Sequence, residues 1–166
     1  VLHDEIFNLL FIIYVLLLFE LLTGTENSTG SGMNIIPFKE IMRYKFGSRM
    51  FIYNVLGNIL IFVPFGYFIS RYVRPKKIWP IIVDAMITSI TVETVQLKIG
   101  RSFDIDDVML NVVGAILGYF VYIALDAIYK HLPKILQKSF IYDVISLIIL
   151  VMFILYAANI LDLRWF

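Results

Sequence analysis

The residue types best suited to chemistry lie in residues 100–107 and in the apolar segment before them. Three carboxylates, Asp104, Asp106 and Asp107, fall within four positions. Carboxylates at this density can supply acid and base groups or oxygen ligands for Mg²⁺ or Ca²⁺, and they exceed what one helix cap requires. The spacing does not match a calcium-binding EF-hand loop, so it identifies neither a metal nor a cofactor.

A further carboxylate, Glu93, falls inside an apolar segment, about 9 Å from its end at the rise of an α-helix. A carboxylate at that depth is costly unless it is protonated or paired. Arg101, in the adjoining loop, is the nearest candidate partner in the sequence. We therefore interpret Glu93, together with Asp104 and Asp107, as candidate catalytic groups.

Other polar side chains recur at helical spacing, which places them on shared helix faces. Asn111 follows Asp107 by four residues, Gln96 follows Glu93 by three, and Lys39 precedes Arg43 by four. Basic side chains suit phosphate groups, and amides suit neutral polar groups. The candidate ligand-binding residues are Arg101, Gln96, Asn58, Asn111, Asp106, Lys39 and Arg43.

The composition indicates which elements position these groups. The 166 residues are 60% hydrophobic and 16% charged, whereas soluble domains are about 45–50% apolar and about 25% charged. A net charge of only +1 gives no reason to expect a nucleic-acid partner. The absence of cysteine excludes disulfides, thiolate metal sites and a cysteine nucleophile.

Apolar segments of roughly 18 or more residues are long enough to cross a bilayer, and five segments approach or meet this length: 6–22, 51–70, 79–99, 108–125 and 144–161. We predict an all-α polytopic membrane protein, a bundle of about five transmembrane helices in one membrane domain over residues 1–166. Ile41, Met42 and Phe46 share a side of residues 39–49, which predicts a short amphipathic interfacial helix between the first two spans.

Small and polar residues inside the spans predict how the helices pack. Gly114 and Gly118 form a GxxxG pair that permits close helix approach. We expect Gly57 and Gly66 to relieve crowding in the second span, and Asn54 to bond a neighbouring helix. Five antiparallel spans also bring the loops 23–50 and 98–107 to one side of the membrane, where most of the intramembrane polar groups lie.

Several motifs occur in a fixed order: NIIPF from residue 34, NVLGN from 54, FVPFG from 62, ExxQ from 93 and GRSFDIDDV from 100, followed by Asn111 and Gly114. Over about residues 34–118 this ordered set resembles the VanZ-like family, named for a teicoplanin resistance protein. The resemblance implies a small multi-pass protein of the bacterial plasma membrane, linked to glycopeptide and lipoglycopeptide resistance. It marks as family positions, without assigning their roles, Glu93, Gln96, Arg101, the acidic run Asp104, Asp106 and Asp107, and the amides Asn58 and Asn111.

Two functions follow as expectations. The first is a polar site that binds a lipid-linked anionic cell-wall precursor or a phospholipid headgroup, with Arg101, Lys39 or Arg43 on the phosphate. The alternative is an intramembrane enzyme that modifies or hydrolyses an envelope lipid through Glu93 and the Asp104–Asp107 cluster. The residues do not distinguish an enzyme from a binding protein, and they indicate no oligomeric state. The expected partners are membrane lipids or a lipid-linked precursor, not nucleic acid.

The orientation in the membrane is predicted from the basic residues, which are equally numerous on the two sides. On the side opposite the polar groups they are concentrated in short loops, which is typical of the cytoplasmic face. We therefore expect the polar site to face outward.

Overall fold

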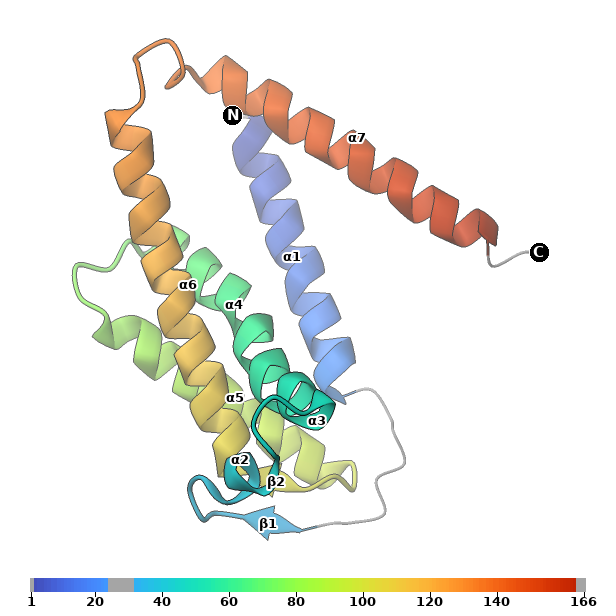
Figure 1. The fold of residues 1–166 in the computed structure, drawn as a ribbon. Helices are drawn as coiled ribbons and strands as arrows, with labels where there is room; N and C mark the ends of the chain where they lie inside the picture. Colours follow the sequence, from blue (N-terminus) through green and yellow to red (C-terminus); the bar gives the residue numbers. More distant parts are fainter. Residues whose placement is uncertain (1, 24–31, 164–166) are drawn as a thin grey trace. The chain divides into compact units, whose positions relative to one another are not determined.

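The computed structural model describes residues 2–23 and 32–163, with side chains for residues 2–20 and 32–152 (Figure 1). The described part of the chain is mostly helical, with one pair of two-residue strands. In order, its elements are α1 (Leu2–Thr23), β1 (Met33–Asn34), α2 (Lys39–Arg43), α3 (Arg49–Phe51), the π-helical turn η1 (Ile52–Leu56), α4 (Gly57–Val73), α5 (Trp79–Lys98), β2 (Phe103–Asp104), α6 (Ile105–His131) and α7 (Ser139–Leu163).

The predicted all-α membrane fold is confirmed. Within the described residues, four helical runs are long and apolar enough to cross a membrane: Leu2–Glu20, Arg49–Val73, Trp79–Lys98 and Ile105–His131. The fifth expected span, residues 144–161, falls within α7. Only the Ser139–Met152 part of α7 is described with side chains, and that part alone is too short to span.

The chain divides into two compact units, a larger one of Val15–Asp126 and a smaller one of Val1–Tyr14 with Ala127–Phe166. In the smaller unit, the backbone N–H of His3 donates to Asp143 Oδ1 at 2.7 Å, and the imidazole Nδ1 lies 2.8 Å from the same oxygen. The rings of Tyr129 and Tyr142 pack with their centroids 5.6 Å apart. These contacts join α1 and the end of α6 to α7.

Glycines bring α4 and α6 of the larger unit into backbone contact, as the GxxxG pair predicted. A methyl group at Gly114 would collide with the carbonyl of Ile59, and one at Gly118 with the carbonyl of Val63. Gly66 of α4 meets the backbone of α6 in the same way. The expectation for Gly57 is wrong, because the space around it is open. Only a glycine permits helix axes to approach this closely.

Polar contacts join α5 to α6 inside the larger unit. Asn111 Nδ2 donates to Ser89 Oγ at 2.8 Å, and both residues are buried. The expectation for Asn54 is wrong, because its Nδ2 donates at 2.8 Å to the carbonyl of Met50, one turn earlier in the same helical run. The η1 turn around Asn54 has π-helical hydrogen bonding, a local widening often found at functional sites.

The segment between the first two spans is less helical than predicted. α2 ends at Arg43, because Tyr44 adopts an extended conformation and Gly47 has a positive φ of 76°. Residues 44–48 therefore form a turn, not the second half of a helix over residues 39–49. Met42 and Phe46 remain 79% and 87% exposed, as expected of apolar groups that contact lipid.

A parallel pairing of two residues on each strand connects the segment between the first two spans to the rest of the larger unit. Met33 and Asn34 of β1 pair with Phe103 and Asp104 of β2, which lies between α5 and α6. The N–H of Phe103 also donates to the carbonyl of Gly32 at 3.0 Å. Figure 1 shows α2, β1 and β2 together at the end of the unit where α5 finishes and α6 begins.

Candidate functional site

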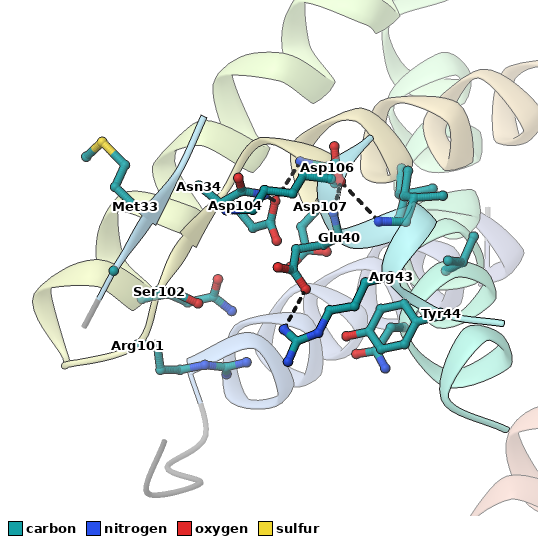
Figure 2. A pocket seen from close by; sticks show the side chains of 17 residues that line it. Met33, Asn34, Glu40, Arg43, Tyr44, Arg101, Ser102, Asp104, Asp106 and Asp107 are labelled. Atoms are coloured by element: carbon teal, nitrogen blue, oxygen red, sulfur yellow. Dashed lines mark hydrogen bonds and ion pairs between the residues drawn. The ribbon is translucent and has the colours of Figure 1, made fainter. Parts of the chain in front are cut away.

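A cavity of about 480 Å³ lies at this end of the larger unit. Residues from β1, α2, η1, β2 and the ends of α5 and α6 line it (Figure 2). The polar lining consists of Asn34, Lys39, Glu40, Arg43, Tyr44, Asn54, Gln96, Arg101, Ser102, Asp104, Asp106 and Asp107. The volume falls within the range of roughly 300–1,000 Å³ that small-molecule sites occupy.

Asp106 holds the wall of the cavity that α2 forms. Its Oδ1 accepts from the N–H of Phe38 at 2.5 Å, and its Oδ2 accepts from the N–H groups of Glu40 and Ile41 at 2.8 and 3.1 Å. The first N–H groups of a helix have no partner within the helix, so this carboxylate caps α2 from another element. Phe38, at the start of α2, has a positive φ of 65°, and its hydrogen bond to Asp106 holds that uncommon conformation.

Asp104 caps the start of α6, so one member of the acidic run serves as the helix cap. Its Oδ1 accepts from the N–H of Asp106 at 2.9 Å, the geometry of an N-cap residue, and from Asn34 Nδ2 at 3.0 Å. Burial raises the pKa of Asp104 above its ordinary value. The two hydrogen bonds favour the ionised form and oppose that increase.

Glu93 lies behind the cavity wall, not in it. The side chain is 2% exposed, and its Oε2 accepts from the backbone N–H of Asp104 at 2.9 Å. The predicted partner Arg101 interacts with this carboxylate electrostatically. Glu93 therefore fixes the backbone of β2, which carries Asp104 into the cavity.

Asp107 connects the cavity to α4. Its Oδ1 accepts from Asn58 Nδ2 at 2.5 Å, and Asp104 and Arg101 both interact with it electrostatically. Asn58 is thus a partner of a cavity residue and does not itself line the cavity. Asn111 does not line it either, since its amide is buried against Ser89.

The basic side chains of the lining come from two elements. Lys39 and Arg43 extend from α2, and Arg101 from the segment before β2. Arg43 Nη1 lies 3.2 Å from Glu40 Oε2. Burial and the carboxylate of Glu40 raise the pKa of Tyr44 above its ordinary value, so its phenol remains a hydrogen-bond donor at neutral pH.

The structure thus places the predicted residues in two groups. Seven line the cavity: Lys39, Arg43, Gln96, Arg101, Asp104, Asp106 and Asp107. Three support it from behind: Glu93, Asn58 and Asn111. The lining also includes polar residues that were not among the predicted ligands, namely Asn34, Glu40, Tyr44, Asn54 and Ser102. Three members of this set lie in the quoted motifs, Asn34 in NIIPF, Asn54 in NVLGN and Ser102 in GRSFDIDDV, and this was the signal available for them.

The acidic run, as placed among the described residues, is not grouped as a metal site of three or more ligands. Among the described residues, no group of three or more His, Asp or Glu side chains is placed to hold a metal ion. The hydrogen bonds explain this, because Asp106 turns toward the amides of α2 while Asp107 turns toward Asn58. The arrangement is suited instead to binding a polar molecule through separate charged groups.

These features define a multi-pass helical membrane protein with a polar cavity at one end of its helices. A family model described as VanZ/LLP1 matches residues 6–128. The chain belongs to this family, and the match extends beyond the motifs of residues 34–118 at both ends. Searches of curated proteins and of solved structures return no significant match.

Proposed function

We propose that this protein binds the headgroup of a phospholipid or of a lipid-linked cell-wall precursor in the cavity, at the outer face of the bacterial plasma membrane. The observation that carries the proposal is the cavity itself, in which Lys39, Arg43 and Arg101 lie beside amide and hydroxyl groups at the ends of membrane-spanning helices. Guanidinium and ammonium groups form strong charge-assisted hydrogen bonds with phosphate. A link to glycopeptide resistance is part of the same proposal, since those drugs act on such precursors.

Binding is favoured over catalysis because of how the carboxylates are used. The candidate acid or base Glu93 accepts a backbone N–H, and both oxygens of Asp106 cap α2. Groups that hold backbone in this way are suited to maintaining a shaped cavity. The enzymatic alternative therefore depends on Asp107 and on the Oδ2 atom of Asp104, whose Oδ1 caps α6.

Lipid binding can be tested with the full-length protein purified in mild detergent and analysed by native mass spectrometry. We expect co-purified phospholipid or precursor on the wild type, and about tenfold less on Arg101→Gln, as expected for loss of one charge-assisted contact. Lys76→Gln is the matched control, because Lys76 is an exposed basic residue outside the cavity. Equal lipid retention by all three proteins would contradict the proposal.

The same variants separate binding from chemistry and test the resistance link. Cells producing Arg101→Gln should lose any teicoplanin tolerance that the wild type confers, whereas cells producing Lys76→Gln should keep it. Purified protein incubated with radiolabelled lipid should return the lipid unchanged. Conversion of that lipid, abolished by Asp107→Asn, would favour the enzymatic alternative instead.

A further inference from the structure

The charges that line the cavity are of both signs. Beside the three basic residues lie Glu40, Asp104 and Asp107, in addition to the fully bonded Asp106. A headgroup that carries only negative charge would meet these carboxylates as well as the basic groups. Like charges brought together in an interface reduce affinity, so a purely anionic ligand does not complement this cavity.

The hydrogen bonds around two of these carboxylates leave acceptor capacity. The bonds that hold Asp104, from Asn34 and from the N–H of Asp106, both use Oδ1. The bond that Asp107 accepts from Asn58 also uses Oδ1. An ionised carboxylate has about four lone-pair sites, so the Oδ2 atom of each remains an acceptor for a ligand.

The carboxylates face a common space. Asp104 and Asp107 repel one another electrostatically, and Glu40, Asp104 and Asp107 all act on the phenol of Tyr44. In Figure 2, Asp104, Asp107 and Glu40 lie around the same space, and Glu40 is already ion-paired with the guanidinium of Arg43 at 3.2 Å. Positive charge placed beside Asp104 and Asp107 would relieve the repulsion between these two carboxylates.

An organic ammonium suits this arrangement better than Ca²⁺ does. Ca²⁺ takes about 6–8 oxygen ligands, and no three described His, Asp or Glu side chains are grouped to hold a metal ion. Hydrogen bonds from an ammonium to carboxylates are about 2.7–2.9 Å long, and its three N–H groups can reach separate acceptors.

We infer that the headgroup bound here is zwitterionic, with a phosphate beside Arg43 and Arg101 and a primary ammonium beside Asp104 and Asp107. This inference rests on the proposed lipid-binding function and narrows its ligand to an amine-bearing phosphate ester carried by a lipid. The basic wall alone would accept any phospholipid, whereas the acidic wall selects those with an ammonium group.

The test compares three lipids with identical acyl chains on the full-length protein: phosphatidylethanolamine, phosphatidylglycerol, which lacks the amine, and phosphatidylcholine, whose nitrogen has no N–H. The variants are Asp104→Asn/Asp107→Asn, which keeps side-chain shape, Arg101→Gln, and the Lys76→Gln control. Native mass spectrometry measures retained lipid, and thermal melting confirms that each variant folds. We expect wild type to retain the ethanolamine lipid about fivefold or more over both others, since each charged contact contributes that order.

The double variant should lose this preference while still retaining phosphatidylglycerol, and Arg101→Gln should bind all three lipids less. Wild-type preference for phosphatidylglycerol, or an ethanolamine preference that survives in the double variant, would overturn the zwitterionic inference and leave the proposed function standing. Retention of none of the lipids by wild type, with no cell-wall precursor co-purified either, would contradict the proposed function. Soluble phosphoethanolamine should displace bound lipid, and equal displacement by glycerol phosphate would count against an ammonium subsite.

Discussion

At the residue scale, the three carboxylates of the acidic run have different structural roles, although they are the same residue type. Asp104 caps α6, Asp106 caps α2 and Asp107 anchors Asn58 of α4. Each carboxylate therefore joins a different pair of elements. On a helix, successive side chains point about 100° apart around the axis. Adjacent acidic residues such as Asp106 and Asp107 therefore reach different partners.

Replacement of Asp106 by Asn tests its capping role. In the variant, the N–H groups of Phe38, Glu40 and Ile41 no longer donate to a charged carboxylate. We therefore expect the free energy of unfolding to decrease by about 3 kcal/mol. Hydrogen exchange should accelerate at the amides of Phe38, Glu40 and Ile41. Asp4→Asn is the control, because Asp4 is half exposed and should change stability little. Unchanged exchange at those three amides would contradict the assigned role.

The raised pKa of Asp104 predicts a pH dependence with a definite sign. The folded protein holds this proton more tightly than the unfolded chain, so stability from this group decreases as the pH rises from the ordinary Asp pKa through the raised one. The charges that act on Asp104 include Asp106 and Glu40, which raise its pKa further.

Asn34→Ala should raise the pKa of Asp104 further above its ordinary value, because the substitution removes a hydrogen bond that stabilises the ionised carboxylate. Carboxyl-carbon NMR titration measures the shift directly. Asn54→Ala serves as the control, since Asn54 also lines the cavity but donates to Met50. A decrease in the Asp104 pKa on removal of Asn34 would refute this account of the site.

At the element scale, the close contact of α4 and α6 positions Asp107, the cavity residue that bonds Asn58 of α4. Asn58 and Asp107 bond to each other just before the glycine contacts begin along these helices. The GxxxG spacing was readable in the sequence, but its partner helix was not. Only the packed helices show that Gly66 takes part and that Gly57 does not.

Two glycine substitutions distinguish these positions. Gly118→Ala places a methyl group against the backbone of Val63 and should destabilise the protein by about 1–3 kcal/mol, the usual cost of overpacking. Gly57→Ala meets open space in a helix and should be neutral or stabilise by about 0.5–1 kcal/mol. Thermal unfolding in detergent measures both. Equal effects of the two substitutions on stability would show that the contact between α4 and α6 does not restrict the size of the side chain at position 118.

At the scale of the whole molecule, the orientation in the membrane remains a prediction, and the absence of cysteine makes it testable. We expect Lys45→Cys, on the cavity side, to react with an impermeant thiol reagent in intact cells. Lys76→Cys, in the loop between α4 and α5, should react only after permeabilisation. The reverse pattern would place the cavity in the cytoplasm and exclude a direct role at the outer surface.

Much of the fold could be predicted from the sequence because the bilayer sets a length and a composition that a chain must satisfy. The helical class, the spans within residues 2–131 and the glycine contact of α6 are confirmed. The helix over residues 39–49 was predicted too long, because amphipathic spacing does not reveal the extended backbone at Tyr44.

The amino-acid pattern alone shows which residues are polar in an apolar chain, and it predicts that they gather toward one side of the membrane. Which of them share a cavity follows only from how the helices pack. The shared cavity depends on β1 pairing with β2, about 70 residues away, and on Asp106 reaching the amides of α2. Helical spacing orders neighbours within one element, whereas contacts between distant elements arise from packing that no local pattern encodes.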